Sequence, residues 1–182
     1  MMAGLLLAAP ISSNNDLIGY TCGNESIDKL VRESFLSHIC GQRTTFKILF
    51  DDSIVGFYSL YISSIIDEES NEPFTEYYDQ NPRFAVVYIK YLAVNKAVQG
   101  NGIGSSVLGH IVKEARHLSE KWPVRLIVFD ALRDKVEWYK KLGFDILSQK
   151  ELDGNSETVK MYFDMFTEEK RQEISEYCEQ NM

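Results

Sequence analysis

Cysteine, proline, histidine and tryptophan are all scarce in this chain of 182 residues, and long apolar runs are missing. The three cysteines, Cys22, Cys40 and Cys178, are odd in number and widely spaced, which indicates free thiols rather than a disulfide framework. No spacing of cysteine or histidine suggests a metal site. No run reaches the roughly 18 apolar residues that a membrane helix requires, and the short apolar start before Pro10 lacks the basic region of a signal peptide. The sequence therefore predicts a cytoplasmic protein without a metal and without a membrane partner.

Positive charge is also in deficit. The chain has 19 Lys and Arg against 27 Asp and Glu, so its formal net charge is −8. Such a balance argues against broad nucleic-acid binding, although a local basic patch is compatible with it. The length predicts one domain over residues 1–182, ending in a polar helix over 167–182 that Thr167 can cap. Apolar spacing predicts a helix over 27–39. Apolar runs predict a hairpin of strands over 45–50 and 54–62, with its turn at 51–53, and a later strand over about 144–149. The polar, acidic segment 67–83 is predicted to be a long loop.

A glycine-rich turn is the most informative motif that is present. It is the run Gln99-Gly100-Asn101-Gly102-Ile103-Gly104, which follows a predicted buried strand over 83–94 and precedes a predicted helix over 105–119. Backbone N–H groups at such a turn have no internal partner and carry the positive end of the helix dipole, so they suit a phosphorylated cofactor. Ser105 stands where a dinucleotide-binding motif needs a third glycine, and no lysine follows to make a P-loop.

The remaining pattern, Q-x-x-G-x-G, resembles the acyl-coenzyme A pyrophosphate motif of the GCN5-related N-acetyltransferase (GNAT) superfamily. A second segment, WYKKLGF at 138–144, resembles that family's ending with an aromatic residue, Tyr and Gly-Phe, and Gly143 is placed as a helix C-cap. The likeness covers about residues 15–166. It implies a single-domain α/β fold with a mixed, mostly antiparallel sheet that is flanked by helices and splayed at its central strands.

The resemblance also implies site residues. Tyr139 matches the tyrosine beside the coenzyme sulfur, where its phenol would protonate the departing thiolate. The backbone N–H of Val94 would stabilise the developing oxyanion. The residues implied in binding acetyl-CoA are Leu92, Ala93, Val94, Gln99, Gly100, Asn101, Gly102, Ile103, Gly104 and Ser105. The general base stays open between Tyr88, Tyr91, Asp130 and ordered water.

These features predict an acetyl-CoA-dependent N-acetyltransferase that moves an acetyl group to a primary amine by direct transfer in a ternary complex. The expected acceptor is a small-molecule or peptide amine, and the resemblance favours a homodimer. Two alternatives remain. The segment TCGNESIDKL at 21–30 resembles the branch that includes TacT-like toxins, which acetylate aminoacyl-tRNA and are inhibited by an antitoxin, and only that alternative makes nucleic acid a partner. The other alternative is a non-catalytic acyl-CoA-binding module.

Overall fold

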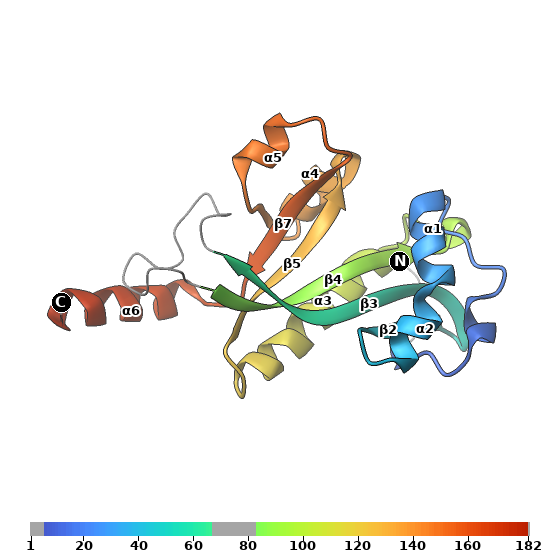
Figure 1. Ribbon diagram of the computed structural model, residues 1–182, viewed down its shortest axis with the longest axis horizontal. Helices are drawn as coiled ribbons and strands as arrows, with labels where there is room; N and C mark the ends of the chain where they lie inside the picture. Colours follow the sequence, from blue (N-terminus) through green and yellow to red (C-terminus); the bar gives the residue numbers. More distant parts are fainter. Residues whose placement is uncertain (1–5, 67–82, 182) are drawn as a thin grey trace. The chain divides into compact units, whose positions relative to one another are not determined.

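The computed structural model describes residues 6–66 and 83–181, which form a mixed α/β fold (Figure 1). Its strands are β1 (Leu6–Pro10), β2 (Thr44–Phe50), β3 (Ser53–Ile66), β4 (Arg83–Val94), β5 (Val124–Leu132), β6 (Asp145–Ile146) and β7 (Thr158–Asp164). Its α-helices are α1 (Glu25–Arg32), α2 (Ser34–Ile39), α3 (Ile103–Ser119), α4 (Val136–Lys140), α5 (Gln149–Asp153) and α6 (Glu168–Asn181). The described strands make a seven-stranded, mostly antiparallel sheet flanked by helices. Of the loop predicted over 67–83, residues 67–82 lie outside the described residues, and Arg83 begins β4.

The chain divides into two compact units, and each is described by itself. The first unit combines Met1–Ile62 with Tyr88–Lys113, and the second combines Ser63–Val87 with Glu114–Met182. Strands of the first unit follow the order β1-β2-β3-β4, and those of the second follow β3-β4-β5-β7-β6, because β3 and β4 contribute to both. The single-domain organisation expected from the length stays a prediction.

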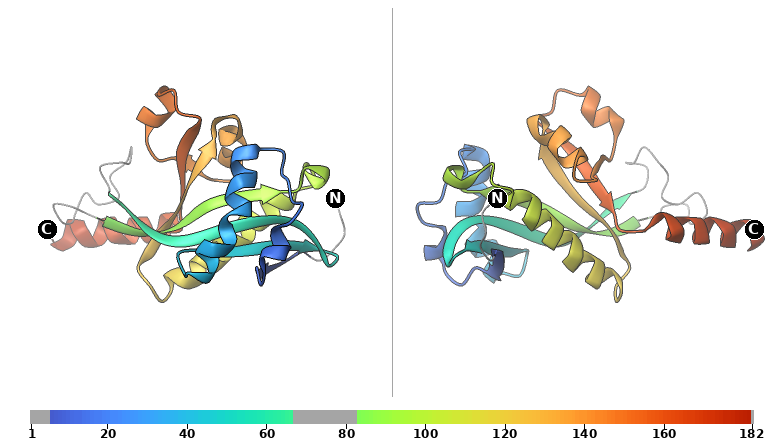
Figure 2. Two further views of the ribbon diagram at one scale, coloured as in Figure 1. Left: turned by 45° about the vertical axis from the view of Figure 1, so that its right-hand side comes forward. Right: turned by 180° about the vertical axis from the view of Figure 1, so that it is seen from behind.

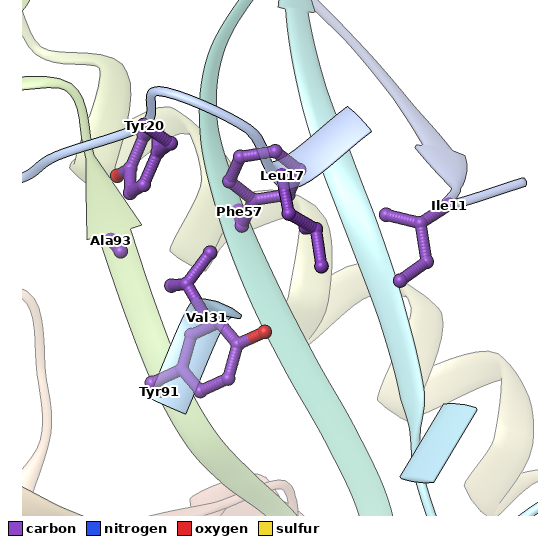
Figure 3. Close-up of a cluster of buried hydrophobic side chains, with 7 residues drawn as sticks. All are labelled: Ile11, Leu17, Tyr20, Val31, Phe57, Tyr91 and Ala93. Carbon is purple, nitrogen blue, oxygen red and sulfur yellow. The ribbon is translucent and has the colours of Figure 1, made fainter. Parts of the chain in front are cut away.

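Helices lie on both faces of the strands in the first unit. Figure 2 shows α1 and α2 on one face and the first part of α3 on the other. Val31 of α1 packs with Phe57 of β3 and with Tyr91 and Ala93 of β4 in a buried cluster (Figure 3). Burial of these apolar surfaces holds α1 against the strands, at about 25 cal/mol per Å² removed from water.

The predicted helix over 27–39 is interrupted at Glu33. The backbone of Glu33 has φ −89° and ψ 0°, and α1 ends there while α2 begins at the next residue. Two serine hydroxyls donate to helix carbonyls beside this break, Ser34 to Val31 at 2.7 Å and Ser37 to Ser34 at 3.0 Å. Such bonds compete with the regular helix ladder and bend it, so apolar spacing alone predicts one helix where the chain forms two.

The hairpin between β2 and β3 has the predicted position. Asp51 and Asp52 both adopt positive φ, 46° and 61°. Two consecutive residues with positive φ match the type I′ turn, whose twist suits antiparallel strands.

A close approach of two strands explains a glycine in the middle of β3. A Cβ added to Gly56 would lie inside contact distance of the Ala93 carbonyl oxygen, and it would stand 3.2 Å from the Val94 Cα and 3.0 Å from the Ile48 Cδ1. Two of these three atoms belong to the backbone of β4 and cannot rotate away. The chain therefore needs glycine here so that β3 can pass the end of β4.

We expect Gly56→Ala to destabilise the protein by about 2–3 kcal/mol, because the added methyl group overpacks a backbone contact. Urea denaturation measures the change. The matched control is Gly109→Ala, in the exposed interior of α3, where nothing lies within 4 Å of the added Cβ. That control should gain about 0.5–1 kcal/mol from helix propensity. Equal midpoints for the two variants would contradict the close approach.

The second unit is built on the antiparallel pair of β5 and β7, which runs from Leu126 opposite Asp164 to Leu132 opposite Thr158. At its Asp164 end, the Arg125 guanidinium donates to the buried Asp164 carboxylate at 2.7 Å and 3.1 Å. The Thr167 hydroxyl accepts the Lys170 N–H at 3.3 Å, which caps α6 as its sequence predicted.

Two predictions in this unit need correction. The strand expected at 144–149 is only Asp145–Ile146, and the polar segment Gln149–Asp153 forms the unpredicted helix α5. The Arg133 guanidinium, more than fifteen residues away, donates to the Leu152, Gly154 and Ser156 carbonyls at 2.7, 2.9 and 2.8 Å. These bonds satisfy carbonyl groups at the helix end that no nearby residue caps, so local sequence rules do not find this helix.

Candidate active site

The glycine-rich turn lies in the first unit and leaves its backbone accessible. Gly100 and Gly102 are exposed and have positive φ, 80° and 83°, and nothing lies within 4 Å of a Cβ added at either position. The N–H groups of residues 100–105 donate to no group in the part of the chain that the structure describes. A turn with free donors at the start of a 17-residue helix fits a diphosphate group.

The side chains of Gln99 and Asn101 point back to the protein. Gln99 Nε2 donates to the Cys22 carbonyl at 2.8 Å and to the Val94 carbonyl at 2.9 Å. Asn101 Nδ2 donates to the Val98 carbonyl at 3.1 Å. Both side-chain amides therefore hold the shape of the turn, and its main-chain N–H groups are left to bind a ligand.

The other residues of the predicted coenzyme site lie next to this turn in the chain. Ala93 is 2% exposed and packs in the core cluster, whereas Leu92 and Val94 are half-buried. Ile103 is buried and anchors the start of α3, while Gly104 and Ser105 are half-buried. The first unit thus contains every residue predicted for coenzyme binding.

Tyr139 lies in the second unit, on α4. Two backbone bonds close this helix end, from the Phe144 N–H to the Tyr139 carbonyl at 3.2 Å and from the Gly143 N–H to the Lys140 carbonyl at 3.0 Å. With Gly143 at φ 87°, they form a Schellman motif, which agrees with the predicted C-cap. The Phe144 ring stands 6.0 Å from the Tyr139 ring, the contact that usually accompanies this motif.

Aromatic neighbours surround the Tyr139 ring but leave its hydroxyl accessible. The ring centroid is 4.5 Å from that of Phe129 and 4.6 Å from that of Trp138. Burial raises the pKa of Tyr139 to about 12. Its hydroxyl makes no hydrogen bond with any described residue. Unlike the hydroxyls of Tyr20 and Tyr91, it is not fully enclosed by protein. The arrangement provides a protonated phenol that can donate to a bound group.

The candidates for a general base have different environments. Tyr91 is 4% exposed, and its hydroxyl is enclosed in the core cluster of the first unit, where Figure 3 shows it reaching from β4 toward β3. Burial raises the pKa of this phenol, which suits a packing role better than proton relay. Tyr88 is half-buried against Tyr61, with 5.0 Å between ring centroids. Asp130 is exposed on β5, opposite Lys160 of β7.

Cys22 and Asp28 belong to the surroundings of the turn, although sequence reasoning did not select them. The Cys22 N–H donates to the buried carboxylate of Asp28 at 2.8 Å, and the Cys22 carbonyl accepts from the Gln99 side-chain amide. The one signal in the sequence was the position of Asp28, an acidic residue on the apolar side of the helix predicted over 27–39.

In residues 6–66 and 83–181, no three His, Cys, Asp or Glu side chains group to hold a metal ion. Across the same ranges, every helix is too short or too polar to cross a membrane.

Comparison with known proteins identifies similar sequences and folds. The model of the acetyltransferase (GNAT) domain matches residues 42–146, more than half of the chain. The tRNA-acetylating toxin of Mycobacterium tuberculosis (strain ATCC 25618 / H37Rv) is 26% identical over 147 residues, which cover 80% of this chain and 87% of the toxin.

Solved structures of bacterial toxins share the fold. AtaT complexed with acetyl-methionyl-tRNAfMet has a TM-score of 0.73 at 17% identity, covering 94% of this chain and 98% of that one. A tyrosine-to-phenylalanine mutant of AtaT, bound to the C-terminus of the antitoxin AtaR and acetyl-CoA, has a TM-score of 0.67 at 19% identity, covering 88% and 93%.

These relatives contradict the predicted partners. A small-molecule or peptide amine was expected as acceptor, with nucleic acid as a partner only under the toxin alternative. One relative, however, acetylates tRNA, and another is solved with an acetylated aminoacyl-tRNA and with an antitoxin. The prediction is wrong because it used the charge of the whole chain. Segment 67–82 and α6 together contain eleven of the 27 acidic residues and two of the 19 basic ones. The remainder has 17 basic and 16 acidic residues, so the total charge says little about any one surface.

Proposed function

Since this chain belongs to the GNAT acetyltransferase family, we propose that it transfers the acetyl group of acetyl-CoA to the amino group of an aminoacyl-tRNA. The observation that carries the choice of acceptor is the 26% identity to a tRNA-acetylating toxin over 80% of the chain. This acceptor replaces the small-molecule or peptide amine that the composition suggested.

Acetyl-CoA supplies an activated thioester carbonyl, which an amine attacks directly. The free N–H groups of residues 100–105 would hold its diphosphate, and Gln99 and Asn101 would keep that turn in shape. The half-buried Val94 at the end of β4 would offer its N–H to the oxyanion that forms on the acetyl carbonyl. Holding the reactants together can account for much of the reduction in the barrier.

The thiolate that leaves needs a proton, and Tyr139 is our candidate for its donor. Since burial raises the pKa of Tyr139 to about 12, the phenol stays protonated at neutral pH. Its hydroxyl has no competing hydrogen bond in the described part of the chain. The Schellman motif at Gly143 and the ring of Phe144 would hold it in one orientation.

The charge of the helical segment around Tyr139 supports an anionic acceptor. Residues 133–141 contain four basic and two acidic side chains, in a chain with a net charge of −8. Lys135 and Lys140 are exposed and pair with Asp134 at 2.8 Å and Glu137 at 3.2 Å, whereas the exposed Lys141 makes no ion pair with any described residue. Exposed lysines of this kind suit the phosphates of a tRNA acceptor end. Because aminoacyl-tRNA is made and used in the cytoplasm, we propose that the protein acts there.

The test is acetylation by the purified protein with radiolabelled acetyl-CoA. The acceptors are aminoacyl-tRNA, the same tRNA without its amino acid, and the free amino acid. We expect label in the charged tRNA alone, recovered as an N-acetyl-aminoacyl group after mild alkaline hydrolysis. Transfer to the free amino acid but not to the charged tRNA would contradict the acceptor. Binding of acetyl-CoA without transfer to any amine would favour a non-catalytic module.

A further inference from the structure

A buried carboxylate lies beside the glycine-rich turn without an ion pair. Asp28 of α1 is 3% exposed, and it pairs with no basic side chain in the described ranges. Its oxygens accept the Thr21 hydroxyl at 2.6 Å and the Cys22 N–H at 2.8 Å. Burial alone raises the pKa of Asp28, but these hydrogen bonds outweigh it and leave the pKa below its usual value. Burying an ionised carboxylate without an ion pair costs folding free energy, so the hydrogen bonds of Asp28 suggest a role beyond packing.

The bonds of Asp28 shape the segment from Thr21 to Gly23. The Thr21 hydroxyl, besides donating to Asp28, accepts the Gly23 N–H at 3.0 Å. Gly23 has φ 85°, and a Cβ added there would stand 3.1 Å from Lys96 Cδ. Val31, one turn further along α1, packs in the core cluster with Phe57 and Tyr91 (Figure 3), so Asp28 stands on an anchored helix.

This segment in turn contacts the chain that leads into the glycine-rich turn. The Thr21 carbonyl accepts the Lys96 N–H at 3.2 Å. The Cys22 carbonyl accepts one N–H of the Gln99 amide at 2.8 Å, and the Val94 carbonyl accepts from the same nitrogen at 2.9 Å. Gln99 therefore joins the end of β4 to the segment that Asp28 holds.

We propose that Asp28 is a positioning residue for acetyl-CoA binding, acting through the Cys22 carbonyl and the Gln99 amide on the turn over 100–105. The proposal rests on the proposed function only in that this turn binds the coenzyme. Asp28 fixes the 21–22 peptide group through the Cys22 N–H, and it fixes the 22–23 peptide group through the Thr21 hydroxyl, which accepts the Gly23 N–H. When Asp28 is removed, both peptide groups are less constrained, the Cys22 carbonyl is no longer held toward Gln99, and the turn over 100–105 loses this support. Asp28 itself does not contact the coenzyme.

A second carboxylate in the same unit provides the matched control. Asp16 also accepts backbone N–H groups, from Ser12 at 2.9 Å and Ser13 at 3.4 Å, and it pairs with Lys47 at 3.1 Å. Among the described residues, Asp16 bonds only to Ser12, Ser13 and Lys47, and none of these lies in the turn or in residues 21–23. Asp16→Ala should therefore lower stability, as Asp28→Ala does, while it leaves the coenzyme affinity unchanged.

The experiment is calorimetric titration of acetyl-CoA into the wild type, Asp28→Ala, Gln99→Ala, the double variant and Asp16→Ala, each with its melting temperature. Asp28→Ala and Gln99→Ala should each weaken binding about fivefold or more. The double variant should bind about as weakly as the weaker single variant, because both changes break one chain of contacts. Asp28→Asn keeps an acceptor oxygen for the Cys22 N–H and should restore most of the affinity.

The proposal is wrong if folded Asp28→Ala binds acetyl-CoA with wild-type affinity, or if Asp16→Ala loses as much affinity as Asp28→Ala. It is also wrong if the loss of affinity in the double variant equals the product of the losses in Asp28→Ala and Gln99→Ala. If Asp28→Ala does not fold, hydrogen exchange of the wild type decides. Added acetyl-CoA should slow exchange at residues 21–23 and leave residues 12–16 unchanged, and no slowing at 21–23 would refute the coupling. If the wild type binds no acetyl-CoA, both this proposal and the proposed function are wrong. If it binds acetyl-CoA but does not acetylate aminoacyl-tRNA, only the proposed function is wrong.

Discussion

Replacing Gly102 with glutamate will reduce acetyl-CoA binding at least a hundredfold, because a carboxylate would enter the position proposed for the diphosphate. Gly102 is exposed at φ 83°, and nothing lies within 4 Å of an added Cβ, so the new side chain has room to extend over the turn. Like charges placed together cost several kcal/mol, and each 1.4 kcal/mol is about a factor of ten in affinity. Calorimetric titration with acetyl-CoA measures the loss.

The chain offers a close control for this variant. Gly41 also has positive φ, 69°, and open space around its Cβ position, but it follows α2 and is remote in sequence from the turn. Gly41→Glu introduces the same charge and similar backbone strain, and it should bind acetyl-CoA as the wild type does. Gly102→Ala separates strain from charge and should lose much less affinity than Gly102→Glu. If both glutamate variants bind acetyl-CoA normally, the coenzyme does not use this turn.

Replacing Tyr139 with phenylalanine will lower kcat for acetyl transfer about a hundredfold or more, while the affinity for acetyl-CoA changes less than about twofold. Phenylalanine keeps the ring that packs on Phe129 and Trp138, so the second unit should retain its stability. The hydroxyl makes no hydrogen bond with any described residue, so its removal breaks no contact within the protein. The substitution removes only the proton that the phenol would donate to the leaving thiolate. Single-turnover acetylation of aminoacyl-tRNA, with calorimetry for acetyl-CoA, measures the two effects.

Tyr91→Phe is the matched control for the loss of a phenol. The Tyr91 hydroxyl is enclosed in the core of the first unit, so its removal should leave kcat unchanged. Because the pKa of Tyr139 is raised to about 12, its phenol is protonated throughout pH 7–9, and a decline in rate in that window belongs to another group. An unchanged kcat in Tyr139→Phe would leave Tyr139 as a packing residue.

Local sequence signals predicted the parts of this protein that depend on a few neighbouring residues. The turn at Asp51 and Asp52, the cap at Gly143 and the glycine turn at Gly100 and Gly102 all follow from backbone conformations that these residues favour. The predicted strand over 83–94 matches β4, because a long apolar run rich in β-branched and aromatic residues is typical of a buried strand.

Long-range contacts explain most of what the sequence did not reveal. Helix α5 depends on Arg133, which satisfies carbonyl groups 19 to 23 residues away. Gln99 looks like a ligand residue in the motif, but its amide bonds to Cys22, 77 residues earlier in the chain. Rules based on residue spacing cannot predict these contacts of Arg133 and Gln99, because the partners come close only in the folded chain.

The sequence by itself determined the family, most of the strands and the turn that suits a coenzyme, because these depend on glycine positions and on apolar runs within short stretches. Only the tertiary structure decided that the Gln99 and Asn101 side chains support this turn and that Asp28 stands behind it. The physical reason is that backbone conformation is largely a local property. The partner of a buried polar group is instead chosen by how distant segments pack, and neither composition nor net charge records that choice.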